Sequence, residues 1–126
     1  MREDVVDRLR RLGFDERDAE TLADHFLDAE ARGRPSHGLT RVEWLATLAD
    51  LQPGARPVRV VAEPGYERWE GRGALGYLTL AAIVDAQLAS PPERARLVVA
   101  SDCFPTGMLG YWVRRLGAAG LVGVAH

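Results

Sequence analysis

The chain has 126 residues and a mass of 13.8 kDa, which fits one domain, or one domain and a fragment of a second. Hydrophobic residues make up 47% and charged residues 27%, a balance typical of globular chains. The formal net charge is −2, which disfavours general nucleic-acid and membrane-surface binding because such proteins are usually basic. All sixteen basic residues are arginine. The absence of lysine excludes Schiff-base catalysis and a P-loop lysine within this chain.

The single cysteine excludes a disulfide framework and a cysteine-cluster metal site within the chain. No apolar run approaches the roughly 20 residues that a membrane span needs. The amino terminus is charged and leads into an amphipathic stretch. We therefore expect no signal peptide and a cytoplasmic setting.

The first part of the chain predicts three helices. Apolar residues recur at helical spacing over residues 5–12. Asp15 is a candidate N-cap for a second helix that extends to about residue 32. Ser36 is expected to cap a third helix, whose apolar positions extend over residues 39–51.

The rest of the chain predicts alternating strands and helices. Strands are expected at 58–62, 66–70, 97–100 and 121–125, and helices at 76–89 and 107–118. Residues 97–100 are the clearest buried strand. A strand at 121–125 needs neighbours, so we expect a truncated architecture or a partner that completes the sheet, and hence an oligomer. The sequence thus predicts an α/β chain, with a helical segment at 1–55 and a partial α/β domain at 56–126.

A glycine-rich run, GRGALG at residues 71–76, matches the pattern G-x-G-x-x-G and precedes an expected helix. Asp102 follows the next apolar strand, in the order of a dinucleotide-binding turn. The strand before a Rossmann turn is apolar, however, whereas residues 67–70 are Glu-Arg-Trp-Glu. A plain tight turn is therefore the favoured interpretation.

His37 and Arg41 have i, i+4 spacing, so on one helix they would share a face. An imidazole can hydrogen-bond or protonate a carbonyl oxygen, and a guanidinium can hold a carboxylate through two hydrogen bonds. Together they would suit a 2-oxo or 2-hydroxy acid. On spacing alone, the simpler interpretation is a helix start with Ser36 as its cap and His37 in its first turn.

Other single residues favour structural roles. Cys103 lies close to an expected helix N-terminus, which could lower its thiol pKa, but a small buried side chain is the alternative. His25 is interpreted as a structural histidine, on the surface or half-buried. The three histidines lack metal-ligand spacing, so we expect no zinc site. Met108, Tyr111 and Trp112 are helix-spaced and expected in the core.

Three stretches together resemble the amino-terminal part of the type-2 malate/L-lactate dehydrogenase family. That family includes malate, lactate, ureidoglycolate and sulfolactate dehydrogenases and cyclic imine reductases. Residues 28–41, DAEARGRPSHGLTR, resemble its acidic helix and S-H-G-x-x-R signature. Residues 70–76 resemble its D-G-x-x-G-x-G-type turn, and residues 107–125 its G-x-x-G-Y-Y helix and following G-L-I-G-I strand. The order and spacing agree across essentially the whole chain.

The resemblance implies a non-Rossmann fold and a homodimer that uses NAD or NADP to act on a 2-hydroxy acid. His37 matches the signature histidine near the substrate, beside Ser36 in the same motif. Arg41 matches the arginine that would hold the substrate carboxylate. The resemblance therefore makes His37 and Ser36 the candidate catalytic residues and Arg41 the candidate substrate-binding residue.

Two departures from the family pattern accompany this match. The family's catalytic histidine lies in an S-x-H-x-G stretch just before the G-Y-Y helix. Alignment on Gly107 puts Pro105 at that histidine and Cys103 at the serine. Proline cannot transfer a proton. Family members also continue into the rest of the nucleotide-binding domain, including a lysine that this chain lacks.

Three functions therefore stay open. The first is an oxidoreductase whose remainder lies on another chain or has been lost. The second is a non-redox enzyme in which His37 or Asp102 transfers a proton, and the third is a non-catalytic subunit that pairs with a full-length or complementary chain. In the first two cases we expect a small carboxylate or imine ligand. Neither nucleic acid nor a membrane is an expected partner.

Overall fold

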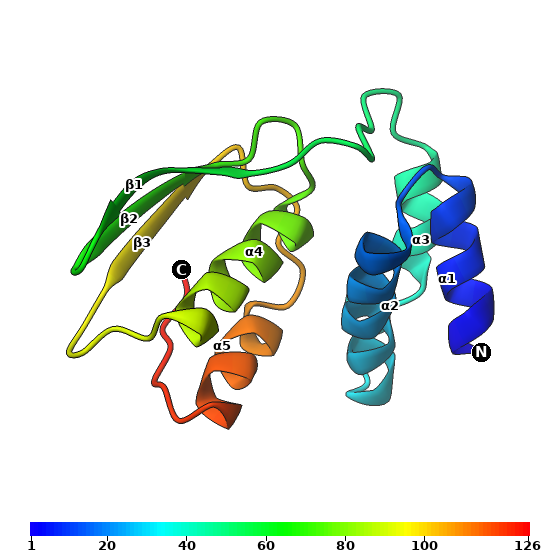
Figure 1. The fold of residues 1–126 in the computed structure, drawn as a ribbon. Helices are drawn as coiled ribbons and strands as arrows, with labels where there is room; N and C mark the ends of the chain where they lie inside the picture. The colour runs from blue at the N-terminus through cyan, green and yellow to red at the C-terminus, as the bar shows by residue number, and fades with distance from the viewer. The chain divides into compact units, whose positions relative to one another are not determined.

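The computed structural model describes all 126 residues, which form two compact units at residues 1–54 and 55–126. The first unit is helical and the second combines a small sheet with two helices (Figure 1). The chain is therefore of the α/β class, as the sequence predicts. None of its helices is both long and apolar enough to cross a membrane.

The first unit begins with two helices, α1 (Arg2–Arg11) and α2 (Glu16–Ala31). The predicted cap of α2 is confirmed, since Asp15 Oδ1 accepts a hydrogen bond from the Asp18 amide at 2.9 Å. Side chains at helical spacing bury one face of each helix. The buried apolar residues of the unit are Val5, Val6, Leu9, Phe14, Ala19, Leu22, Ala23, Phe26, Ala29, Val42 and Leu45.

A short 3-10 turn, η1 (Pro35–His37), precedes the third helix, α3 (Thr40–Ala46). The prediction of one helix capped by Ser36 is wrong, because Leu39 occupies the N-cap position and no side chain of its own caps the helix. Proline at the start of η1 lacks an amide hydrogen and suits a first-turn position. The Leu39 amide instead donates to a side chain of another helix, Glu30 of α2.

Helix α3 also ends earlier than the sequence predicts, at Ala46 rather than near residue 51. Thr47 follows the helix, and its hydroxyl donates to the Trp44 carbonyl at 2.6 Å. The same carbonyl also accepts from the Thr47 amide at 2.9 Å, so Thr47 caps the helix end through its backbone and its side chain. The apolar residues beyond this point are half-buried without helical structure, as at Leu48 and Leu51.

The second unit contains a three-stranded sheet in the order β1-β2-β3. The strands β1 (Val58–Glu63) and β2 (Tyr66–Glu70) form an antiparallel hairpin. Helix α4 (Gly76–Ala89) then leads to β3 (Leu97–Ser101), which lies parallel to β2. Helix α5 (Leu109–Ala118) follows, and both helices lie on the same side of the sheet in Figure 1. The carboxyl ends of β2 and β3 therefore meet at one edge of the unit.

A buried carboxylate lies on the helix-covered face of this sheet. Glu67 is 4% exposed, and its Oε1 accepts hydrogen bonds from Trp69 Nε1 at 3.0 Å and Gln87 Nε2 at 2.9 Å. Its Oε2 accepts from Arg59 at 3.2 Å and lies 3.9 Å from Arg96. Burial alone raises the pKa of Glu67, but these hydrogen bonds and positive charges outweigh it, so the pKa is lowered.

Two strand predictions need correction. Strand β3 is not buried, because helices cover one face only and Leu97 and Val99 on the other are 63% and 42% exposed. Residues 121–125 form no strand, and Val122 and Val124 are 96% and 94% exposed. No strand is hydrogen-bonded to the 121–125 segment, and a strand needs such a neighbour. The oligomer expected from that segment stays a prediction.

The aromatic core prediction is confirmed for two of its three residues. Tyr111 and Trp112 are 9% and 2% exposed and their rings meet edge to face at 4.8 Å, while Met108 is half-buried. His25 is fully buried rather than on the surface or half-buried. Its ring lies edge-on to Phe26, with centroids 6.1 Å apart, which supports a structural role.

Candidate functional site

The signature segment places His37 and Arg41 on two different elements. His37 ends η1, where its amide donates to the Arg34 carbonyl at 3.0 Å. Arg41 lies in the first turn of α3, and its amide donates to the Gly38 carbonyl at 2.9 Å. The prediction that the two share a face of one helix is therefore wrong. Their relative placement depends on the Gly38–Leu39 link and not on a helical repeat.

The His37 ring presents one nitrogen to its surroundings. Its Nδ1 is buried and has no hydrogen-bond partner, whereas Nε2 is neither buried nor hydrogen-bonded within the chain. The side chain as a whole is half-buried. A ligand can therefore reach His37 through Nε2, which could donate to or accept from an oxygen atom.

The Arg41 guanidinium is held on two sides. Its Nε donates to the Ser36 carbonyl at 3.0 Å, and its central carbon lies 5.1 Å from the centre of the Trp44 ring. The Nη1 and Nη2 atoms make no hydrogen bond or ion pair within the chain. A guanidinium edge of this kind matches the two oxygens of a carboxylate.

Ser36 contacts Arg41 through its backbone and not through its side chain. Its carbonyl accepts from Arg41, while its exposed side chain makes no hydrogen bond. The structure thus joins Ser36 to Arg41 and places His37 beside them in the chain. Whether Ser36 or His37 transfers a proton stays a prediction.

The glycine turn at residues 71–76 lies in the second unit, after β2. All three of its glycine amides have acceptors: Gly71 N donates to the Ser101 carbonyl at 2.9 Å and Gly76 N to the Phe104 carbonyl at 3.3 Å. Gly73 N donates to Asp102 Oδ2 at 2.7 Å. A diphosphate would have to displace these acceptors, one of which carries a negative charge. These hydrogen bonds disfavour a dinucleotide diphosphate at this turn, and a plain tight turn stays the favoured interpretation.

The loop after β3 packs directly against this turn. A Cβ atom at Gly76 would lie 2.8 Å from both the Cys103 carbonyl carbon and the Phe104 nitrogen. Only glycine permits that approach of two backbones. Pro105, at the position that the family pattern gives to a histidine, is buried and follows a cis peptide bond. It offers no titratable group to the site.

Cys103 is not activated. Burial, together with the negative charge of Asp102, raises the pKa of its thiol to about 11. Its Sγ lies 3.8 Å from the Gly76 carbonyl oxygen. The possibility of a lowered thiol pKa is therefore excluded, partly because α5 begins only at Leu109, too far along the chain for its N-terminus to act on the thiol.

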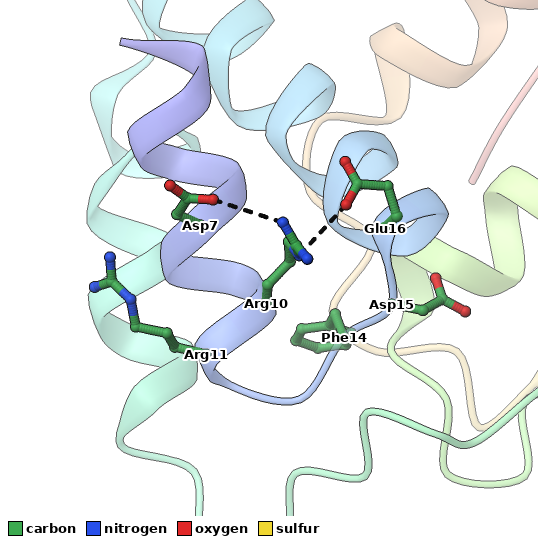
Figure 2. Close-up of a pocket in the computed structure, with 6 residues that line it drawn as sticks. All are labelled: Asp7, Arg10, Arg11, Phe14, Asp15 and Glu16. Atoms are coloured by element: carbon green, nitrogen blue, oxygen red, sulfur yellow. Dashed lines mark ion pairs between the residues drawn. The ribbon is translucent and has the colours of Figure 1, made fainter.

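A separate pocket of about 580 Å³ lies where α1 meets α2 (Figure 2). Arg10 points between Asp7 and Glu16, which it contacts at 3.8 Å and 3.3 Å. Three carboxylates and two guanidinium groups share the lining with one aromatic ring, from Asp7, Arg10, Arg11, Phe14, Asp15 and Glu16. This acid-rich lining does not suit an anionic substrate and includes none of the sequence-predicted site residues. No group of His, Cys, Asp and Glu in the chain could hold a metal ion.

Comparison with known proteins identifies the relatives of this chain. The family model described as malate/L-lactate dehydrogenase matches residues 1–126. A malate dehydrogenase of Pyrococcus horikoshii is 26% identical over 128 residues, which cover 96% of this chain and 35% of that protein.

Solved structures share the fold. Malate dehydrogenase from Entamoeba histolytica matches with a TM-score of 0.84 at 19% identity, over 94% of this chain and 34% of that one. The delta1-piperideine-2-carboxylate reductase of Pseudomonas syringae pvar. tomato matches with a TM-score of 0.75 at 20% identity, over 94% of this chain and 38% of that one.

These matches define the class of protein as an oxidoreductase-family chain of dehydrogenase fold. The chain belongs to the malate/L-lactate dehydrogenase family. It spans about a third of the length of the relatives that it matches. Membership in a family of dehydrogenases implies a nicotinamide cofactor for the family's reaction.

Proposed function

We propose that this chain supplies the carboxylate-binding part of an oxidoreductase that uses NAD or NADP and acts on a small 2-hydroxy or 2-oxo acid. The observation that carries the proposal is the Arg41 guanidinium, fixed by Ser36 and Trp44 while its Nη edge has no partner in the chain. A guanidinium that is held in one orientation and has no internal partner on its Nη edge is suited to bidentate binding of a carboxylate.

In this proposal His37 Nε2 hydrogen-bonds the 2-oxygen of the bound acid and is the candidate proton donor to it. Ser36 holds Arg41 through its carbonyl. Pro105 stands where the family pattern has its catalytic histidine and cannot donate a proton. His37, in the S-H-G-x-x-R signature, is therefore the imidazole that remains for this role. The hydrogen bonds of the glycine turn disfavour the cofactor's diphosphate there, and we therefore assign cofactor binding to the part of the fold that the relatives have beyond the matched third.

A second candidate function is a non-catalytic or non-redox subunit that works with a second copy or a complementary chain. Pro105 is the observation that favours it, because a buried proline replaces the expected acid–base group. Exposed Val122 and Val124 are compatible with such a partner. In the non-redox form, His37 or Asp102 would transfer the proton.

Calorimetric titration with pyruvate tests the carboxylate site. Arg41→Ala should weaken binding by about tenfold or more, since hydrogen bonds to a charged group contribute about 1.5–3 kcal/mol. Arg34→Ala is the matched control, because Arg34 is an exposed arginine of the same segment and its loss removes an equal charge. Equal affinity in the wild-type and Arg41→Ala proteins would remove Arg41 from the site.

Fluorescence titration with NADH and NADPH tests the assignment of the cofactor site. Saturable binding, by this chain alone or as an oligomer, would support the oxidoreductase and would contradict the assignment of the cofactor site to the part beyond the matched third. Pyruvate binding without any nucleotide binding is expected when the cofactor site lies outside this chain, and it agrees with both candidate functions. Light scattering on the same samples reports whether the binding species is a monomer or an oligomer.

A further inference from the structure

Glu30, near the end of α2, reaches the signature segment from outside it. Its Oε1 accepts a hydrogen bond from the Leu39 amide at 2.8 Å. Leu39 is the N-cap residue of α3, and its aliphatic side chain cannot accept the amide hydrogens that a helix leaves unpaired. The carboxylate of Glu30 therefore supplies, from a different helix, a cap that the local sequence lacks.

Gly38 and Glu30 also share space. A Cβ atom on Gly38 would lie 2.7 Å from Glu30 Cδ and 2.8 Å from Glu30 Cγ. A methyl group on Gly38 would therefore overlap the side chain of Glu30. The side chain of Glu30 thus lies directly against the link between His37 and α3.

The Gly38–Leu39 link sets the distance between the two candidate ligand-binding groups, the His37 ring and the Arg41 guanidinium. His37 precedes Gly38, and the Gly38 carbonyl accepts the Arg41 amide at 2.9 Å. Glu30 fixes the next peptide through Leu39. Any movement of this peptide changes the distance between the His37 ring and the Arg41 guanidinium.

We infer that Glu30 is a positioning residue, which sets the placement of His37 relative to Arg41 by holding the Leu39 amide and filling the space beside Gly38. The inference rests on the proposed function only for its effect on ligand binding. Glu30 itself is an anion and does not bind the carboxylate. Its contribution is to the placement of the His37 ring relative to the Arg41 guanidinium.

Proton NMR of the His37 ring tests the geometry without any ligand, after assignment with His37→Gln. Glu30→Ala should shift the His37 ring resonances, because the Leu39 amide loses its acceptor. Glu30→Gln keeps an oxygen acceptor of the same reach and should leave them close to the wild-type positions. Glu43→Ala, which removes an exposed carboxylate from α3, is the control for charge alone. Wild-type His37 resonances in Glu30→Ala would overturn the inference.

A double-mutant cycle tests the shared space. Gly38→Ala should destabilise the protein because its methyl group overlaps the Glu30 side chain. In the Glu30→Ala background the same substitution should be much less damaging, since the obstructing atoms are gone. The two effects should therefore be strongly non-additive, as for residues in direct contact. Additive effects on the urea midpoint would contradict the packing relationship and with it the inference.

Pyruvate titration then separates this inference from the proposed function. If wild-type protein binds pyruvate, Glu30→Ala should weaken binding by about tenfold, whereas Glu30→Gln should not, because a small misplacement of binding groups is costly. If the wild type does not bind pyruvate, the proposed function fails at this site. The His37 resonances and the double-mutant cycle still decide whether Glu30 positions the segment.

Discussion

Asp102 and Gly73 are hydrogen-bonded across the two turns that follow the parallel strands, with Asp102 Oδ2 accepting the Gly73 amide at 2.7 Å. Both residues have left-handed backbone conformations, with φ of 50° for Asp102 and 87° for Gly73. Glycine adopts this region freely, but an aspartate does so at a conformational cost. The side-chain hydrogen bond compensates that cost and ties the loop after β3 to the turn after β2.

Substitutions at Asp102 can measure separately the hydrogen bond to Gly73 and the cost of a left-handed conformation at residue 102. Asp102→Asn keeps an acceptor and tolerates the left-handed region, so its free energy of unfolding should stay within about 0.5 kcal/mol of wild type. Asp102→Gly loses the bond, at about 1 kcal/mol, without any left-handed strain in the folded state. Asp102→Ala loses the bond and adds about 1 kcal/mol of left-handed strain. Urea unfolding followed by tryptophan fluorescence measures all three, and an alanine variant as stable as the asparagine variant would contradict the argument.

The second unit shows which elements a sequence can define. Helix α4 could be predicted to the residue, because a glycine turn precedes it and Ser-Pro-Pro at 90–92 follows it. Two predictions, that β3 is buried and that residues 121–125 form a strand, were wrong for the same reason. An apolar run indicates that the backbone favours an extended, strand-like conformation. It does not show which face of the strand is covered or whether a neighbouring strand exists.

The candidate site was predictable in its residues and not in its geometry. The family resemblance points to Ser36, His37 and Arg41, whereas helical spacing placed the last two on one face. Glu30 takes the Leu39 amide from another helix, and spacing within the segment carries no signal of that contact. The buried Glu67 was also missed, although its i, i+2 relation to Trp69 puts both on one strand face and could have indicated burial.

The Glu67 cluster predicts loss of stability in acid. Because the folded protein lowers the pKa of Glu67, the unfolded chain binds the proton more tightly, and folding is favoured when the carboxyl is ionised. This contribution is complete above the unfolded value of about 4.3 and is lost as pH falls through the lower folded pKa. The free energy of unfolding should therefore decline below about pH 5.

Glu67→Gln is the variant that isolates this effect. It keeps an acceptor for Trp69 and Gln87 but removes the charge that faces Arg59 and Arg96. The variant should lose about 1–3 kcal/mol at pH 7, because Arg59 and the half-buried Arg96 lose the negative charge that they face. Its stability should also depend less on pH between 3 and 5 than that of the wild type. Parallel curves for the two proteins would show that another carboxyl group dominates acid unfolding.

Cys103 should react slowly with thiol reagents in the folded protein. A pKa of about 11 lowers the thiolate fraction at pH 7.5 by about 300-fold relative to a free cysteine, and the higher nucleophilicity of the thiolate recovers about tenfold of this. The rate of alkylation by iodoacetamide should thus be about 30-fold below that of the urea-unfolded chain. Asp102→Asn should raise the rate, since it removes the neighbouring negative charge. A folded-state rate equal to the unfolded rate would show that the thiol is neither buried nor perturbed.

Gly76 is the position where a single methyl group should disrupt the contact between the two turns. A Cβ atom there meets backbone atoms of Cys103 and Phe104 at 2.8 Å, and backbone cannot move aside as a flexible side chain can. Gly76→Ala should therefore destabilise the protein by about 2 kcal/mol or more, as for other overpacked sites.

Gly117→Ala is the matched control for this substitution. Gly117 lies in α5, and a Cβ atom there meets nothing within 4 Å. Its replacement by alanine should be neutral or stabilising by up to about 1 kcal/mol, because alanine is the better helix former. Urea unfolding of the two variants side by side separates the steric effect from the general effect of replacing glycine. Equal midpoints for Gly76→Ala and Gly117→Ala would mean that the loop after β3 does not lie against the turn in solution.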